Sequence, residues 1–299
     1  MQNLILTRQQ AHNPILGISA MLLSVLLFSM MDATVKWLGS TYPTQQIMFF
    51  RCLVATIPVA VIIYSRGGFK VLKTQQPKMH LLRSLLGVSA MGFAFYAFSL
   101  MPLAEAISIL NTTPLFMTAL SVLILGEKVG RHRWAAVVAG FIGMLIVVRP
   151  GVGILQSGSL FMLIAALLIG FTTIIIRYLS VKDDPVCITF YFSLFGIIVS
   201  AIGIVLFGWV PPAPNDWLFL IAVGLFGGLA QYLMTLSYQH SEIAVVAPMK
   251  FLSIAFGGLL GYFIWTEIPD FQTLVGIIII VASGLYTLHR EMLRRKMQD

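Results

Sequence analysis

Five charged side chains lie inside long apolar runs of this chain, and they are the residues best placed to do chemistry. They are Asp32, Lys36, Arg51, Glu105 and Lys250. A charged group at the centre of a bilayer costs about 2.5–3.5 kcal/mol on insertion scales, so such residues face protein or a water-filled path. Each is therefore a candidate for binding a substrate or for carrying a proton.

Each of these charges also has a structural interpretation. Asp32 and Lys36 stand four residues apart, so they can form an ion pair on one helix face or take a direct role in substrate or proton binding. Arg51 can hold a carboxylate with its planar guanidinium. Glu105, near a helix start, stabilises the helix dipole and can also carry a coupling proton. Lys250 is far from the ends of its run and has no acid within four residues, which favours a site.

Uncharged polar and aromatic residues in the apolar runs complete the candidate set. A few polar groups in an apolar cavity suit an amphiphilic organic ligand, although each residue alone is equally compatible with packing. We predict that substrate is bound by Arg51, Lys250, Tyr96, Asn111, Gln231 and Tyr232, and that Asp32, Lys36 and Glu105 serve coupling or ion pairing.

The charge balance within the apolar runs bears on the substrate. Lys36, Arg51 and Lys250 stand against Asp32 and Glu105, which leaves one positive charge without a partner. We expect a ligand with a carboxylate or another anionic oxygen, unless burial deprotonates Lys250. No catalytic residue, metal site or cofactor is predicted, because the five histidines are scattered and no Walker-type phosphate loop is present.

The composition indicates which elements must hold these side chains. The chain of 299 residues is 59% hydrophobic and 10% charged, whereas a soluble domain is about 25% charged. Its apolar stretches are long enough to cross a bilayer as helices. The net charge of +8 comes from basic residues clustered in loops, which indicates membrane orientation rather than nucleic-acid binding. We predict an all-α integral membrane protein.

Loops placed at Pro, Gly and charge clusters predict ten transmembrane helices. The expected ranges are 15–38, 44–64, 81–101, 103–125, 134–149, 158–180, 186–208, 217–238, 243–265 and 271–289. With both termini in the cytoplasm, the Lys- and Arg-rich loops all face inward, as the positive-inside rule requires. The expected location is a bacterial inner membrane.

The two halves of the sequence repeat one another. Lys36 recurs as Arg177 at an offset of 141, and Glu127 recurs as Glu267 at an offset of 140. Five spans per half is an odd number, so the repeats at 15–150 and 158–290 are expected to be inverted relative to each other. Inverted repeats are typical of carriers in which the substrate site lies between the halves and rocking alternates its access.

The chain resembles the EamA branch of the drug/metabolite transporter superfamily. The resemblance rests on "PLAEAISILNTTPLFMTALSVLILGEKVGRHRWAAVVAGFIGMLIVVRPG", with Pro114 inside a helix and Gly126-Glu127 at its end, and on "SEIAVVAPMKFLSIAFGGLLGYFIWTEIPDFQTLVGIIIIVASG". The second segment departs from the pattern at Thr266-Glu267 and at Lys250. The resemblance implies a ten-helix carrier of small organic metabolites or amphiphilic drugs, commonly moving them outward.

The expected function is a secondary transporter that exports small organic metabolites such as amino acids or amphiphilic compounds by alternating access. The alternatives are an importer of a vitamin or nucleoside-like metabolite and, less favoured, a membrane enzyme or channel. The expected partners are a small-molecule substrate and the lipid bilayer, without nucleic acid, and the expected state is a monomer or weak dimer. We also expect Glu127 and Glu267 to serve helix ends, and Cys52 and Cys187 to be buried thiols.

Overall fold

The computed structural model of the chain describes residues 14–65, 68–113, 115–116, 131–148, 157–241 and 246–296. Pro114 and Glu127 lie outside the described residues, as does the side chain of Arg177. The described residues form helices joined by short connections. The α-helices are α1 (Pro14–Leu38), α2 (Thr44–Ser65), α3 (Pro77–Phe98), α4 (Leu103–Leu110), α6 (Arg131–Val148), α7 (Ser157–Ser180), α8 (Pro185–Phe207), α9 (Trp217–His240), α11 (Leu252–Trp265) and α12 (Phe271–Lys296), and the 3-10 helices are η2 (Gly68–Leu72) and η3 (Ala247–Phe251).

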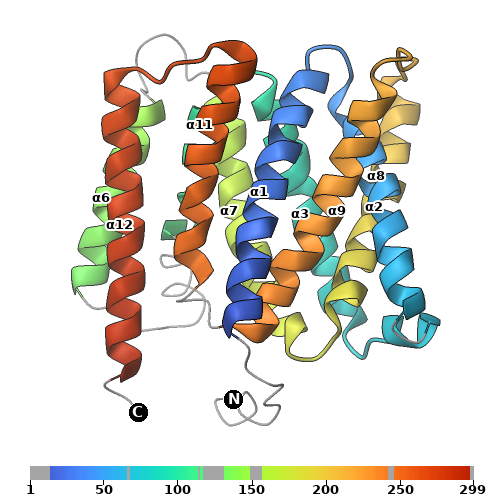
Figure 1. Cartoon of the computed structure of the whole chain (residues 1–299), viewed down its shortest axis with the longest axis horizontal. Coiled ribbons are helices and arrows are strands. Elements are labelled where there is room, and N and C mark those ends of the chain that lie inside the picture. The colour runs from blue at the N-terminus through green and yellow to red at the C-terminus, as the bar shows by residue number, and fades with distance from the viewer. Residues whose placement is uncertain are drawn as a thin grey trace.

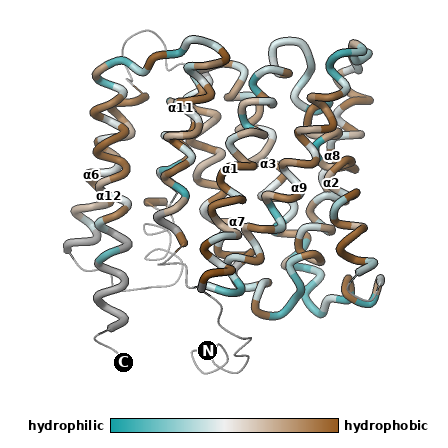
Figure 2. The backbone as a smooth tube through the Cα atoms, viewed as in Figure 1, coloured by the Kyte–Doolittle hydropathy of each residue, from teal (hydrophilic) through white to brown (hydrophobic). Residues whose placement is uncertain are grey.

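The helices have the length and composition of membrane spans. Six of those described are long and apolar enough to cross a bilayer, namely α1, α2, α3, α7, α8 and α9, and three shorter apolar helices accompany them. Hydrophobic residues fill the middle of the helices, and hydrophilic residues gather at the ends of the bundle (Figure 2). These apolar helices confirm the predicted all-α membrane fold. The count of ten spans stays a prediction.

Two of the predicted spans are interrupted near their prolines. In the predicted span 103–125, α4 ends at Leu110, Asn111 and Thr112 form a turn, and helical residues follow at Thr113, Leu115 and Phe116. The predicted span 243–265 starts with η3, which contains Pro248, and becomes α-helical at Leu252. Proline removes a backbone donor and disfavours the regular α-helix on its N-terminal side. Broken helices of this kind occur in transporters, where they line a path through the membrane.

The helices pack as two groups. In the first group α1 and α2 both pack on α9, and α1 also packs on α11. In the second group α3 packs on α7 and α8, and α7 packs on α4. The groups meet where α2 packs on α8 and where α4 packs on α11, and α6 and α12 pack together at one edge of the bundle (Figure 1). Each group contains helices from both halves of the sequence, so the packing does not correspond to one sequence half rocking against the other.

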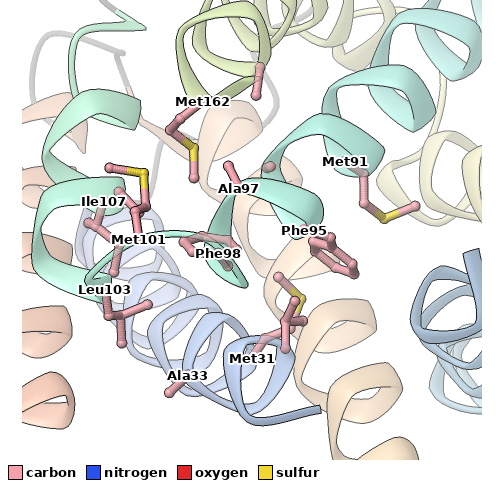
Figure 3. Packing of buried hydrophobic residues seen from close by; sticks show 14 of the residues in the cluster. Met31, Ala33, Met91, Phe95, Ala97, Phe98, Met101, Leu103, Ile107 and Met162 are labelled. Carbon is pink, nitrogen blue, oxygen red and sulfur yellow. The ribbon is translucent and has the colours of Figure 1, made fainter. Parts of the chain in front are cut away.

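Apolar side chains and glycines hold these helices together. The largest buried cluster spans both groups and includes Met31, Phe98 and Met162 (Figure 3). A Cβ added at Gly228 would lie 2.8 Å from the Cβ of Ala55, so α9 can approach α2 this closely only with glycine at that position. Gly257 meets Ile107 of α4 in the same way. Small residues allow such close helix contacts in membrane proteins. Both cysteines are buried and free, as predicted.

Candidate functional site

Arg51 of α2 is buried in the interior of the bundle, where its side chain is short of hydrogen-bond partners. It is 3% exposed. Its Nη2 donates one long hydrogen bond of 3.4 Å to the carbonyl of Gly227 on α9, and its Cζ lies 4.8 Å from the ring centre of Phe192 on α8. Its Nε and Nη1 have no hydrogen-bond partner. The predicted candidate is therefore a buried cation with unused donors.

Arg83 of α3 is a second buried cation, and it is absent from the residues predicted from the sequence. It is 1% exposed, its Cζ lies 3.7 Å from the ring centre of Phe192, and its Nε and Nη1 also lack partners. The third span was expected to begin at residue 81, which placed Arg83 at the cytoplasmic edge of the span, among the basic residues of the preceding loop. Pro77 indicates the earlier start of this helix, because proline is favoured at the first position of a helix. A helix beginning there carries Arg83 well into the bundle.

Glycines make room for both guanidinium groups. A Cβ at Gly227 would lie 2.9 Å from Nε of Arg51, and a Cβ at Gly87 would lie 3.3 Å from Nη1 of Arg83. The ring of Phe192 contacts both cations. Aromatic faces attract guanidinium ions, and this attraction is stronger where water is excluded. The chain thus accommodates two cations in its interior without giving them an acid to pair with among the described residues.

The unsatisfied polar atoms of the described structure concentrate in this region. Eight buried side-chain nitrogen or oxygen atoms have no hydrogen-bond partner, and six of them belong to four residues: Arg51, Arg83, Ser193 and Gln231. Ser193 follows Phe192 on α8, and Gln231 lies one turn beyond Gly227 on α9. Buried polar groups are normally paired, so such a concentration points to a missing partner. These four residues with Phe192 and Gly227 are called the arginine site below. It lies where the two helix groups meet.

The predicted ion pair between Asp32 and Lys36 is wrong. The ammonium of Lys36 pairs instead with the carboxylate of Glu267, which follows α11, and also donates to the carbonyl of Met101 at 3.0 Å. Oε2 of Glu267 accepts a hydrogen bond of 2.9 Å from the backbone N–H of Leu103, at the start of α4. Glu267 therefore serves a helix end, as predicted, and is also the missed partner of Lys36. Half-buried Asp32 forms no ion pair with any described residue.

The other predicted residues lie in separate places. Half-buried Lys250 holds its Nζ 5.5 Å from the ring centre of Tyr238, and Asn111 donates to Ser253 Oγ at 3.0 Å, which links α4 to α11. Tyr96 is 44% exposed and packs edge-on against Phe161. Glu105 and Tyr232 are half-buried. Of the predicted substrate-binding residues, Arg51 and Gln231 belong to the arginine site.

Polar contacts between the two groups close both ends of the bundle. At one end, called the Tyr42 end, Gln46 exchanges two hydrogen bonds with the backbone of Val210, at 2.7 and 3.0 Å, and Lys36 and Glu267 hold the α3–α4 connection. Tyr42 donates to Asp216 at 2.7 Å there, and this hydrogen bond raises the pKa of the Tyr42 phenol above its ordinary value.

At the opposite end, called the His80 end, Gln239 of the first group donates to the carbonyl of Ser180 in the second group at 3.1 Å. Asp183 accepts from Thr74 at 2.8 Å and contacts His80 Nε2 at 2.8 Å. These contacts order the connection between α7 and α8 against the start of α3. No cluster of His, Cys, Asp and Glu suited to a metal ion occurs in the part of the chain that the structure describes.

Curated bacterial transporters are similar to this chain over nearly its whole length. An S-adenosylmethionine uptake transporter of Rickettsia bellii is 29% identical over 284 residues, which cover 92% of this chain and 94% of that protein. A pseudopaline exporter of Pseudomonas aeruginosa is 29% identical over 269 residues (89% and 94%). A riboflavin transporter of Rhizobium johnstonii is 28% identical over 289 residues (94% of each chain).

A solved crystal structure and a family profile agree with this likeness. The crystal structure is 20% identical, has a TM-score of 0.66 and covers 98% of this chain and 100% of the other, which supports the fold alone. The profile of the EamA-like transporter family matches the chain twice, at residues 15–149 and 156–288. Together these segments take in most of the sequence. The chain therefore belongs to the EamA-like transporter family.

Proposed function

We propose that this secondary transporter exports a small organic metabolite, such as an amino acid or an amphiphilic compound, by alternating access. The observation that carries the proposal is the arrangement of polar contacts along the bundle. Hydrogen bonds join the two helix groups at both the Tyr42 end and the His80 end, while the arginine site between them holds buried polar atoms without partners. A carrier needs such a centre and two ends that open in turn.

The packing pattern supports the proposed architecture of ten helices in two inverted repeats, at 15–150 and 158–290. If α1, α2, α3 and α4 correspond to α7, α8, α9 and α11, the main contacts in one group have counterparts in the other. The pair α1 and α9 corresponds to α7 and α3, and the pair α1 and α11 corresponds to α7 and α4. The pairs α2–α8, α4–α11 and α6–α12 then lie on the symmetry axis, as expected for inverted repeats.

The proposed orientation places the His80 end and both termini in the cytoplasm of a bacterial cell. Lys70, Lys73 and Lys78 lie at this end, and basic residues favour the cytoplasmic side. The Tyr42 end carries the aromatic residues Trp37, Trp209, Trp217 and Trp265 instead, and Trp is enriched at membrane interfaces. We further propose that the protein acts as a monomer or weak dimer.

Import of a vitamin or nucleoside-like metabolite is the second candidate. The similarity to transporters named for S-adenosylmethionine uptake and for riboflavin favours it, while the similarity to the pseudopaline exporter favours export.

Asp32 is the residue we assign to the coupling proton, because its carboxylate lies within a span and forms no ion pair with the described residues. Protons entering along their gradient would then drive export.

Efflux from bacterial cells tests direction and orientation together. A fluorescent protein fused after Asp299 should fluoresce, because this reporter folds only in the cytoplasm. Cells that produce the fusion should release preloaded amino acids faster than cells that produce its Asp32→Asn variant. Faster accumulation of vitamins or nucleosides, without faster release of any preloaded compound, would establish the importer instead.

A further inference from the structure

We propose that Arg51 and Arg83 together bind an anionic group of the transported substrate, a carboxylate in the simplest case, beside the ring of Phe192. This inference rests on the proposed transport function and names the chemistry of its binding site. Arg83 is essential to it, because two buried cations that contact one aromatic ring repel each other, and an anion held by both removes this repulsion.

Burial is the first argument for this site. Both side chains are at least 97% buried, since Arg51 is 3% exposed and Arg83 is 1% exposed. Desolvating a guanidinium is costly unless it is paired and hydrogen-bonded. Arginine keeps its charge in proteins, so neutralisation through proton loss does not relieve this cost. A bound anion would relieve this cost of desolvation.

Unused hydrogen-bond donors are the second argument. Nε and Nη1 of both arginines lack partners, and Arg51 makes one long bond to a carbonyl through Nη2. A carboxylate has two oxygens that each accept from guanidinium groups, and the planar fork of arginine matches it in two parallel hydrogen bonds. Gln231 Nε2 and Ser193 Oγ, also unpartnered, add donors for further substrate oxygens.

Location is the third argument. Arg51 belongs to α2 of the first helix group and Arg83 to α3 of the second, and the two share contact with Phe192 of α8. An anion held by both arginines would bridge the groups at their junction. It would also remove the repulsion between the two cations, so its binding would draw the groups together. This is the behaviour required of a substrate in the occluded state of a carrier.

Acetate is the probe, because it is the simplest stable carboxylate, and acetamide is its neutral control. The purified protein in detergent is titrated with each at constant ionic strength, and its unfolding temperature is recorded. Acetate should raise this temperature in a saturable way, and acetamide should not. Arg51→Gln and Arg83→Gln should each weaken acetate binding by about tenfold or more. Arg83→Lys, which keeps the charge without the fork, should bind acetate with intermediate affinity.

Lys182→Gln is the matched control. Lys182 also contacts an aromatic ring, with its Nζ 4.6 Å from the centre of Tyr178, but it is exposed and lies in the α7–α8 connection. This variant should respond to acetate as the unchanged protein does. In acetate-free buffer, the two Gln variants should unfold at the same or a higher temperature, because each removes an unpaired buried charge.

Three results would overturn the proposal: no saturable effect of acetate on the unchanged protein, an effect of acetate on both Gln variants as large as its effect on the unchanged protein, or a markedly lower unfolding temperature of both variants in acetate-free buffer. The last result would mean that the arginines hold the fold. Failure of alternating access is separate, because acetate binding requires no transport. If the protein bound acetate but did not transport, the anion site would be supported and the proposed transport function would be wrong.

Discussion

We expect transport to stop when a disulfide bond joins the two helix groups at the Tyr42 end. The pair to introduce is Gln45→Cys with Gly203→Cys, in α2 and α8, because a Cβ at residue 203 would lie 3.1 Å from the Cβ of Gln45. Disulfides join Cβ atoms about 3.5–4.5 Å apart, so a small adjustment suffices. If substrate leaves through the Tyr42 end, the oxidised protein should transport at background rate, and a reducing agent should restore transport.

A second disulfide gives the matched control for this experiment. Met101→Cys with Gly158→Cys also bridges distant parts of the sequence near the Tyr42 end, since a Cβ at residue 158 would lie 3.4 Å from the Cβ of Met101. It joins the α3–α4 connection to α7, however, and both belong to the second group. The oxidised control should remain active. Native Cys52 and Cys187 are first replaced by Ala. Full activity of the oxidised pair at positions 45 and 203 would show that this end does not open along α2 and α8.

Removing either Lys36 or Glu267 alone should destabilise the protein, and removing both charges should restore its stability. The side chains are 11% and 22% exposed, so each variant, Lys36→Met or Glu267→Gln, leaves a largely buried charge without its partner. Loss of one partner of a buried ion pair costs about 3–5 kcal/mol, and the residual exposure here reduces the expected cost to about 1–3 kcal/mol. In the double variant, the N–H of Leu103 keeps a neutral amide oxygen at position 267 as its acceptor.

The measurement is a double-mutant cycle of thermal unfolding, combined with transport. The coupling between Lys36 and Glu267 should amount to about 1–3 kcal/mol, and the double variant should regain transport. If Lys36 bound substrate directly, the double variant would be stable but inactive. Additive losses of stability would mean that the two charges do not depend on each other.

The sequence predicts the membrane fold and one half of the arginine site. A charged residue within an apolar run is identified from its neighbours in the sequence alone. Arg51 is identified in this way because the surrounding segment is apolar on both sides. The same criterion does not identify Arg83, because the segment "QQPKMHLLR" is polar. Only the helix start at Pro77 places that arginine inside the bundle. Local hydropathy therefore fails where a polar segment is the first part of a span.

Long-range packing explains the wrong ion pair. Asp32 and Lys36 have the spacing of a helical pair, yet Lys36 finds Glu267, which lies 231 positions away in the sequence. The spacing within one helix indicates which partners Lys36 can have. The packing of α1 against α11 determines which partner it contacts. The hydrogen bond from Asn111 to Ser253 likewise depends on tertiary structure, because it joins the end of α4 to α11.

The proposed carrier exposes the arginine site to one side of the membrane at a time. Exchange in proteoliposomes tests it most directly, with a compound released in the efflux experiment. The entry of labelled compound is measured with and without unlabelled compound inside. Alternating access predicts saturable entry that is accelerated by internal compound, because the loaded carrier returns the site to the outside. Entry that rises linearly with concentration and does not respond to internal compound would mean that the protein is not an alternating-access carrier.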